Sequence, residues 1–457
     1  MDNFVDFGAG GLSHPQVAVS EMTSQLNAKH VVVAGLGLSG QACLRFLMGQ
    51  PVTLSAWDTR AEKTLPEGID IPLTNGQPPE DYWDNVDLLV VSPGLALDHP
   101  QLQRASQQNV EIIGEIELFA RFNQAPVLGI TGSNGKTTVT LLTTHILKAC
   151  GINAVAAGNV GLPALDAMSL NPEAIVLELS SFQLETTHSL ALVGATILNI
   201  SDDHLDRHKT LAAYSDAKQR IYNHAQSALC WRDQQLTYPL PLMVDVIEFG
   251  QQAELHDFGL KNHWITWQGE PLVNLAEVKL VGLHNVLNIQ AALGLAMLLG
   301  VDARQAAAAV YTFEAVAHRC VPVSDKGGIT WIDDSKATNV GATIAALQGL
   351  GAERSGKLIL IAGGDAKGAA VKALQPYFDQ YVDELVTLGR DGKQIGRLKQ
   401  GSVHTESMQA AVIQAHQFAR PGDIVLLSPA CASLDMFKNY EHRAHAFIEA
   451  IASGDVC

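Results

Sequence analysis

Residues 125–150, "APVLGITGSNGKTTVTLLTTHILKAC", decide which fold we expect for this 457-residue chain. The segment opens with an apolar run over 125–132, which is typical of a buried parallel strand. A helical pattern follows over 138–150, and a glycine-rich turn with Lys136 and Thr137 lies between the two. A strand, a glycine-rich turn and a helix in this order are typical of a phosphate-binding loop in an open α/β sheet.

The turn carries the groups that hold a nucleoside triphosphate. Its backbone N–H groups can surround phosphates, the Lys136 ammonium can neutralise the β- and γ-phosphates, and the Thr137 hydroxyl can bind Mg²⁺. Ile130 stands where the usual G-x-x-x-x-G-K-[ST] pattern has its first glycine, while the G-x-x-G-K-T core is kept. We therefore expect the triphosphate on Gly132, Ser133, Asn134, Gly135, Lys136, Thr137 and Thr138.

The whole chain alternates short apolar runs with helical stretches, which predicts three open, doubly wound α/β domains. We expect an N-terminal domain over 1–114, with 1–25 as a flexible extension, a central P-loop domain over 115–315 and a C-terminal domain over 316–457. Residues 234–281 break the alternation and predict a small antiparallel patch on the central domain. The expected strands cover 30–35, 52–58, 87–94, 125–132, 152–159, 174–181, 194–201, 328–335, 357–365, 384–390 and 423–433.

Composition excludes several classes of function. A net charge of −17 argues against a nucleic-acid partner, which needs an excess of Lys and Arg. No apolar run reaches the ~20 residues that span a bilayer, and "MDNFVDFGAGGLSHPQ" at the N-terminus lacks the basic region of a secretory signal. The six cysteines are scattered, without a C-x-x-C pair, which suits a reducing compartment. We expect a cytoplasmic protein with no membrane partner.

Polar residues that could bind metal follow two strands of the central domain. Glu178 ends the apolar run "AIVLEL", where its carboxylate could meet Mg²⁺ held at the P-loop. The loop "NISDDHLDRH" over 199–208 is a candidate for a second metal, and Lys218 follows in a helix. That loop contains Asp202, Asp203, His204, Asp206 and His208.

Further binding residues are expected in the second half of the chain. Asn285 and Asn288 share one face near the start of a helix over 282–300, which indicates either a helix cap or adenine recognition. Three polar strand ends of the C-terminal domain predict a binding cleft, because ligands bind at the carboxyl ends of parallel strands. They are "DDSKATN" (333–339), "GGDAKG" (363–368) and "SPACASLDMFKNY" (428–440).

A second glycine-rich loop, Gly35-x-Gly37-x-x-Gly40, follows the first expected strand. With Asp58, 18 residues beyond Gly40, it could hold the diphosphate and ribose of NAD in an oxidoreductase. That function leaves the P-loop and the C-terminal domain without a role. The glycine loop favours any diphosphate at a helix N-terminus, so it is weak evidence for a dinucleotide.

The motifs "TGSNGKT", "HNVLN", "DDSKATN" and "SPACASLDMFKNYEHR", in this order, resemble those of the Mur ligases of peptidoglycan synthesis. The resemblance covers essentially the whole chain from residue 30. The C-terminal motifs look like the D-glutamate-adding type, and no D-N-P-R box of the diaminopimelate-adding type is present. It implies a monomeric ATP-dependent ligase that joins UDP-N-acetylmuramoyl-L-alanine to D-glutamate through an acyl phosphate. A ligase for another amino acid and a regulator that only binds ATP stay as alternatives.

The resemblance also implies a role for each site residue. In the N-terminal domain the uridine nucleotide, not NAD, would lie on Gly37, Ser39, Asp58, Thr59, Arg60 and Gly94, with Ser39 standing where relatives often have Thr. Asn159 would contact the sugar-peptide, Asn285 and Asn288 the adenine, and Asp334 the ribose. Thr338, Lys367, Ser433 and Leu434 would bind D-glutamate, and Tyr440 stands where glutamate-adding relatives have Phe.

The same resemblance assigns the catalytic groups. Lys136, Arg319 and Lys336 would face the ATP phosphates. Thr137 and Glu178 would hold one Mg²⁺, and His204 and Lys218 would serve a second. An ammonium cannot bind a metal, so the resemblance implies that Lys218 carries a carbamate formed with CO₂. Domain closure is expected, because ATP and the amino acid would bind on different domains.

Overall fold

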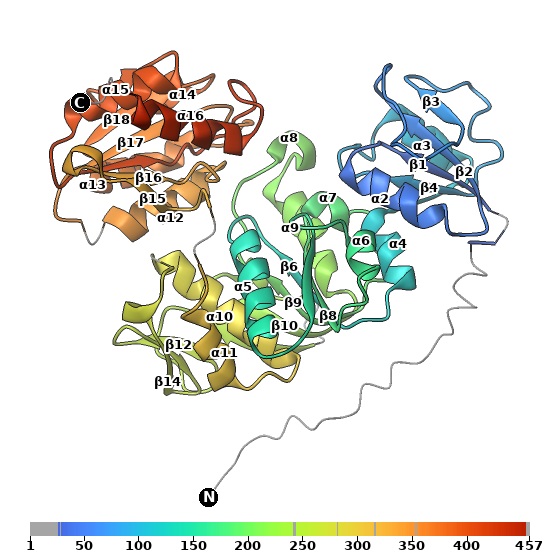
Figure 1. Cartoon of the computed structure of the whole chain (residues 1–457), viewed down its shortest axis with the longest axis horizontal. Helices are drawn as coiled ribbons and strands as arrows, with labels where there is room; N and C mark the ends of the chain where they lie inside the picture. Colours follow the sequence, from blue (N-terminus) through green and yellow to red (C-terminus); the bar gives the residue numbers. More distant parts are fainter. Residues whose placement is uncertain are drawn as a thin grey trace, which may run out of the picture.

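The computed structural model describes residues 26–453 except 28, 241–243, 281, 315–316 and 352–353. The predicted extension over 1–25 and the predicted boundary at 315–316 lie outside the described residues. Three units, each built on its own parallel or mostly parallel sheet, follow one another along the chain (Figure 1). The predicted class of three open α/β units with a small antiparallel sheet is confirmed.

The N-terminal unit contains a parallel sheet in the order β3-β2-β1-β4-β5. The predicted strands at 30–35, 52–58 and 87–94 are present, and the sequence analysis missed β3 and β5. Gly40 lies so close to β1 that a Cβ on it would be 1.9 Å from the Gly35 carbonyl oxygen. The elements are β1 (His30–Ala34), α2 (Leu38–Leu47), β2 (Thr53–Asp58), β3 (Leu73–Asn75), β4 (Leu88–Val91), α3 (Pro100–Gln107) and β5 (Glu111–Gly114).

The central unit has a six-stranded parallel sheet in the order β11-β10-β9-β6-β8-β7. Helices α5 (Lys136–Ala149) and α10 (Leu283–Leu298) pack against each other. The strands are β6 (Val127–Thr131), β7 (Ala154–Gly158), β8 (Ala174–Glu178), β9 (Leu192–Ile197), β10 (Ala225–Trp231) and β11 (Asp245–Phe249).

One prediction for this unit was wrong in part. The antiparallel patch expected over 234–281 is smaller, and consists of β12 (Phe258–Lys261), β13 (Trp264–Trp267) and β14 (Glu270–Asn274). Strand β11, "DVIEF", instead extends the parallel sheet at its edge. An edge strand is half-exposed, so it alternates polar and apolar residues as an antiparallel strand does.

The C-terminal unit has a sheet in the order β15-β16-β20-β17-β18-β19, in which only β15 runs antiparallel to its neighbour. The four predicted strands are confirmed, and β15 and β19 were missed. The strands are β15 (Val321–Ser324), β16 (Thr330–Asp333), β17 (Leu358–Gly363), β18 (Glu384–Leu388), β19 (Val403–His404) and β20 (Ile424–Leu427). The main helices are α12 (Val340–Gly351), α13 (Gln375–Tyr381), α15 (Met408–Phe418) and α16 (Tyr440–Ala452).

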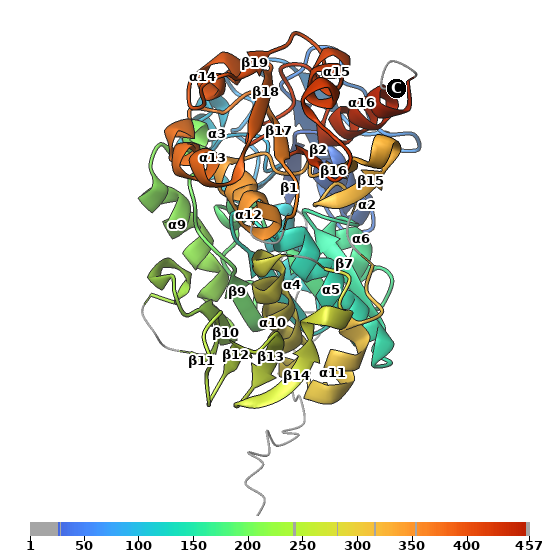
Figure 2. The same cartoon turned by 90° about the vertical axis from the view of Figure 1, so that its left-hand side faces the viewer.

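The three units are joined unequally. One apolar core contains buried residues of both the N-terminal and the central unit, with α4 (Glu115–Phe122) contributing to it. The C-terminal unit has two apolar clusters of its own. Figure 2 shows its helix α12 above α10 of the central unit. Within the described part of the chain, no helix is both long enough and apolar enough to cross a membrane.

Candidate functional site

The P-loop turn begins where β6 ends, at Thr131. Gly132 and Gly135 have φ angles of 147° and 85°, a left-handed backbone that favours glycine. The Asn134 N–H donates to Asn199 Oδ1 over 2.8 Å, so the turn is held by the segment that follows β9. This is the strand–turn–helix context that the sequence predicts, with α5 starting at Lys136.

Lys136 folds back over the turn. Its Nζ donates to the carbonyl oxygens of Gly132 (2.7 Å) and Ser133 (3.0 Å). Burial lowers the pKa of the Lys136 ammonium, an effect that the Glu178 carboxylate opposes. The ammonium is therefore at the turn where the sequence predicts phosphates.

Glu178 has one carboxylate oxygen satisfied and one unsatisfied. Its side chain is buried at the end of β8, and Asn159 Nδ2 donates to Oε1 over 2.7 Å. The other oxygen, Oε2, is buried and has no hydrogen-bond partner among the described residues. A buried, unpaired carboxylate oxygen next to a phosphate-binding turn fits a divalent cation. Thr137, the other residue expected to hold this cation, lies in the first turn of α5.

Lys218 lies on α9 (Leu211–Gln219) and points into the protein. It is 1% exposed, and its Nζ donates to Thr131 Oγ1 (3.1 Å) and to the Gly132 carbonyl (3.0 Å). The Tyr214 ring, one helical turn earlier, lies 4.5 Å from Nζ. Burial, followed by the nearby Lys136 charge, lowers the pKa of Lys218 well below its usual range. In its protonated form, the Lys218 ammonium has no lone pair with which to bind a metal.

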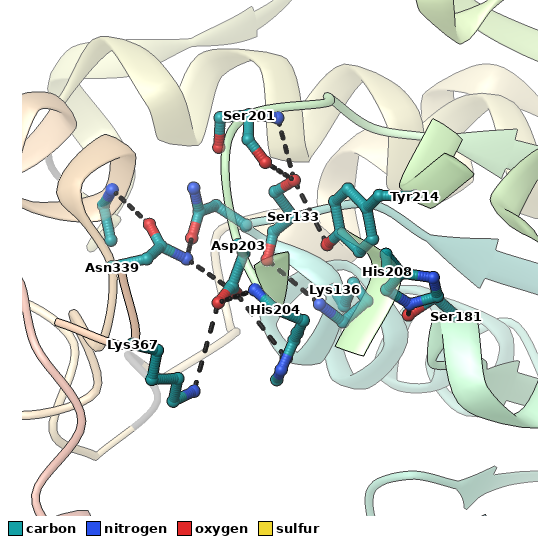
Figure 3. A network of polar contacts seen from close by, with 12 residues as sticks. Ser133, Lys136, Ser181, Ser201, Asp203, His204, His208, Tyr214, Asn339 and Lys367 are labelled. Atoms are coloured by element: carbon teal, nitrogen blue, oxygen red, sulfur yellow. Dashed lines mark hydrogen bonds and ion pairs between the residues drawn. The ribbon is translucent and has the colours of Figure 1, made fainter. Parts of the chain in front are cut away.

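The loop over 199–208 brings His204 beside the P-loop (Figure 3). The His204 backbone N–H donates to Asp203 Oδ1 (2.9 Å), and its imidazole Nε2 is 3.7 Å from Asp203 Oδ2. His208 instead hydrogen-bonds Ser181 over 2.9 Å and stacks on Phe182. The Asp206 side chain lies outside the described residues. No three His, Cys, Asp or Glu side chains of the described chain form a metal-binding group.

A cavity of about 400 Å³ joins several of these predicted residues. It lies between the N-terminal and central units, because Gly94 lines it together with central-unit residues. The predicted site residues on its wall are Gly94, Lys136, Asn159, His204 and Lys218.

A second cavity, of about 300 Å³, lies on the other side of the P-loop. Central and C-terminal residues share its wall, and Asn288 Nδ2 donates to Asn285 Oδ1 over 3.0 Å there. The structure thus brings predicted site residues of the central and C-terminal units together on the wall of this cavity. They are Asn134, Gly135, Thr138, Asn285, Asn288, Arg319, Asp334 and Lys336.

Burial perturbs the charged groups of this second cavity. It raises the pKa of Asp334 to about 7, although Ser428 Oγ donates to the carboxylate over 2.7 Å. Burial and the neighbouring Arg319 lower the pKa of Lys336 to about 8. The Lys336 ammonium also lies 3.8 Å from the centre of the Tyr440 ring. Strongly perturbed groups in a cavity favour a binding or catalytic role.

The residues predicted for D-glutamate lie on the C-terminal unit and are less closely grouped. Lys367 Nζ is 4.0 Å from Asp203 Oδ1, across the gap between units. Ser433 is buried, whereas the adjacent Leu434 is 72% exposed. Thr338 lies just before α12, and its N–H donates to the Lys336 carbonyl over 2.8 Å. Among the described residues that line the two cavities, none of these four is found.

The residues predicted for the uridine lie at the carboxyl end of the N-terminal sheet. Asp58 ends β2 and accepts the Leu36 N–H of the glycine loop (2.8 Å). The Arg60 guanidinium pairs with it and holds the pKa of Asp58 well below its usual range. Gly37, Thr59, Arg60 and Gly94 are exposed, and Ser39 is half-buried.

Two polar residues that organise the site, Tyr214 and Asn339, were not predicted from the sequence. Tyr214 OH hydrogen-bonds Ser133 Oγ over 3.3 Å, and Ser133 Oγ also donates to the Ser201 carbonyl (3.0 Å). Asn339 bridges the C-terminal unit to the P-loop. Tyr214 could have been found by its spacing of four from Lys218 on one helix face. Asn339 closes the "DDSKATN" motif, but its partners come from another unit.

Three family models match the chain. They are described as the N-terminal domain of MurD-like Mur ligases over 29–114, the Mur ligase middle domain over 130–296, and the Mur ligase glutamate ligase domain over 318–431. These matches correspond to the three units described above.

Curated relatives match over almost the full length. The chain is 41% identical to the UDP-N-acetylmuramoylalanine–D-glutamate ligase of Idiomarina loihiensis, with 93% of this chain and 97% of the relative covered. It is 44% identical to the enzyme of that name from Shewanella oneidensis, with 91% and 96% covered. Among solved structures, a pseudomurein peptide ligase type C from Methanothermus fervidus has the same fold, with a TM-score of 0.63, 17% identity, and 93% and 100% coverage.

Proposed function

The chain belongs to the Mur ligase family, and from this premise we propose that it joins D-glutamate to UDP-N-acetylmuramoyl-L-alanine at the expense of ATP. The reaction makes an amide bond in peptidoglycan precursor synthesis. It takes place in the cytoplasm, where ATP is available, and the protein acts as a monomer. The three domains cover 1–114, 115–315 and 316–457.

One observation carries this proposal: the P-loop turn lies between two cavities. Asn134, Gly135 and Thr138 face the cavity shared with the C-terminal unit, and Lys136 faces the cavity shared with the N-terminal unit. A nucleotide in the first cavity, with its terminal phosphate at Lys136, would present that phosphate to a carboxylate in the second. Phosphoryl transfer depends on this positioning and on charge neutralisation.

In the first step, an oxygen of the L-alanyl carboxylate attacks the γ-phosphorus, and the bond to the β-phosphate oxygen breaks. This gives an acyl phosphate and ADP. Lys136, Arg319 and Lys336 neutralise the phosphate charge, and Asn159 orients the sugar-peptide. The adenine lies at Asn285 and Asn288, and the ribose at Asp334.

In the second step, the neutral amine of D-glutamate attacks the acyl carbon. The tetrahedral adduct collapses with loss of inorganic phosphate, and the amine proton passes to solvent. Thr338, Lys367 and Ser433 hold the carboxylates of D-glutamate, while Leu434 and Tyr440 pack beside it. The UDP moiety stays on the N-terminal unit, at Gly37, Ser39, Asp58, Thr59, Arg60 and Gly94.

Magnesium fits the donor set of this site. Thr137 and Glu178 would hold one ion, which is supported by the unpaired buried Oε2 of Glu178. His204 and a carbamylated Lys218 would hold a second ion. When bound, the ions neutralise charge on the transferring phosphate.

The test is phosphate release by the purified protein with ATP, Mg²⁺ and UDP-N-acetylmuramoyl-L-alanine, across a panel of D- and L-amino acids. Release that depends on D-glutamate and on the UDP-sugar supports the proposal. Dependence on another amino acid would assign the ligase a different specificity. Release with neither acceptor, or quenching of NADH fluorescence on titration, would contradict it.

A further inference from the structure

Asn339 uses both ends of its side-chain amide. The residue is 5% exposed and precedes α12. Its Oδ1 accepts the Ala342 N–H over 2.9 Å, which caps the start of the helix. Its Nδ2 donates to Asn134 Oδ1 (3.0 Å) and to Asp203 Oδ2 (3.2 Å), both in the central unit.

These two partners belong to the two central-unit loops that carry the proposed chemistry; Figure 3 shows Asn339 beside Asp203. Asn134 is part of the P-loop turn. Asp203 precedes His204, and its other oxygen accepts the His204 N–H and lies 4.0 Å from Lys367 Nζ. One side chain of the C-terminal unit therefore contacts the P-loop and the His204 loop together.

Helix α12 approaches the central unit closely at two glycines. A Cβ on Gly341 would lie 2.9 Å from Ser201 Oγ and 3.2 Å from Asn134 Nδ2. A Cβ on Gly349 would lie 3.2 Å from the Cα of Gly282, which precedes α10. Both positions are tighter than ordinary van der Waals contact, so the helix rests directly on the central unit.

Apolar packing does not explain this arrangement. Among the described residues, each buried apolar cluster with C-terminal members consists of C-terminal residues alone. The position of the C-terminal unit on the central unit thus depends on the close approach of α12 to the central unit and on a few polar contacts. One of these polar contacts comes from the buried Asn339 amide, which donates to the Asp203 carboxylate.

We propose that Asn339 is a positioning residue, which holds the C-terminal unit docked and so fixes Thr338 and Lys367 relative to the P-loop. The effect on substrates rests on the proposed function. Helix capping alone does not require asparagine, because an Asp carboxylate caps a helix equally well. The side chain of an Asp at 339 has no N–H to donate, however, and would place its carboxylate against that of Asp203.

The experiment compares Asn339→Asp, Asp203→Asn and the double variant with wild type. Asn274→Asp is the matched control: Asn274 caps the short 3-10 helix Leu275–Glu277 by accepting the Ala276 N–H (3.2 Å), and its Nδ2 donates to Glu277 (2.6 Å), outside every predicted site. We expect Asn339→Asp to lower kcat/KM for D-glutamate about ten- to hundredfold, the range for lost hydrogen bonds to charged groups. The KM for the UDP-sugar should stay unchanged.

Two further results are expected. The double variant restores a donor facing a carboxylate, so its loss should be smaller than the product of the two single losses. Small-angle X-ray scattering with ADP and Mg²⁺ should give a larger radius of gyration for Asn339→Asp than for wild type.

The proposal is overturned if Asn339→Asp matches wild type, if Asn274→Asp is equally impaired, or if the double variant shows no recovery. Scattering does not depend on turnover. If wild type shows no D-glutamate-dependent phosphate release, the proposed function is wrong. The docking role of Asn339 is then judged from the scattering result alone.

Discussion

Three cationic side chains, those of Lys136, Arg319 and Lys336, lie at the P-loop and the cavities beside it, in a chain whose net charge is −17. Burial lowers the pKa of each of the three. The Lys136 charge further lowers the pKa of Lys218, and the Arg319 charge that of Lys336. Burial and neighbouring positive charges both disfavour the charged form of such a side chain. A bound polyanion stabilises that charged form. This local charge, rather than the charge of the whole chain, selects the triphosphate.

Lys336 makes nucleotide binding dependent on pH. Its pKa is about 8 in the protein without ligand, and a bound triphosphate favours the charged form and so raises that pKa. Above pH 8, binding must then take up a proton, and affinity must fall as the pH rises. Calorimetric titration with a non-hydrolysable ATP analogue and Mg²⁺ at pH 8.5, in two buffers of different ionisation enthalpy, measures this uptake.

Lys336→Arg is the control for this measurement, because arginine stays charged throughout the range. We expect the variant to take up fewer protons on binding than wild type. Equal proton uptake by the two proteins would show that Lys336 is not the titrating group.

Lys218 should carry a carbamate. Carbamate formation needs a neutral amine, and burial favours the neutral form of Lys218. With ¹³C-labelled bicarbonate, wild type should show a carbamate carbonyl signal by NMR that Lys218→Ala lacks. Activity should fall at least about a hundredfold in Lys218→Ala, as expected for loss of an anionic metal ligand, and a short carboxylic acid should restore part of it. A Lys218→Arg variant as active as wild type would rule the carbamate out.

At the scale of elements, Gly40 sets the distance between α2 and β1. A Cβ there would be 1.9 Å from the Gly35 carbonyl oxygen, which is rigid backbone, so Gly40→Ala must push the helix outward. We expect a destabilisation of about 1–3 kcal/mol, typical of overpacking, and weaker binding of the UDP-sugar. Faster hydrogen exchange over 30–58 would report the change. Gly49→Ala is the control, because its Cβ would meet only an ordinary contact at 3.5 Å.

The elements that the sequence predicted correctly are those with a strong local signal. Strands β1, β6 and β17 are buried on both faces, so their residues form unbroken apolar runs. Strands β3 and β19 are short and lie at sheet edges, where burial imposes no such run. These two edge strands were missed and the edge strand β11 was given the wrong direction, whereas the edge strand β7 was predicted; the interior strand β10 was also missed.

The site was predictable to the extent that its residues share one motif. The phosphate-binding turn contains Gly135, Lys136 and Thr137 in succession, so their spacing in the sequence is enough to indicate them. Asn339 contacts Asn134, 205 positions away, and no local pattern encodes that contact. The contacts between units require the three-dimensional structure.

At the scale of the whole molecule, the N-terminal and central units form one block. They share an apolar core, and Arg45 of α2 pairs with Asp166 of the central unit over 2.5 Å. Arg207 of the central unit also donates to the Pro93 carbonyl (3.3 Å). In the part of the chain that the structure describes, the C-terminal unit shares no buried apolar cluster with the other two, so its position is the one that ligands can change most readily.

This asymmetry predicts how local damage spreads. Leu177 belongs to the core that the first two units share, and Leu360 belongs to the core of the C-terminal unit. Truncating either to Ala should lower the stability of its unit by about 2–5 kcal/mol. Hydrogen exchange followed by mass spectrometry should then show Leu177→Ala weakening protection over both 30–114 and 127–197, and Leu360→Ala only over 317–453. If Leu177→Ala leaves 30–114 fully protected, the two units fold independently and the shared core does not couple them.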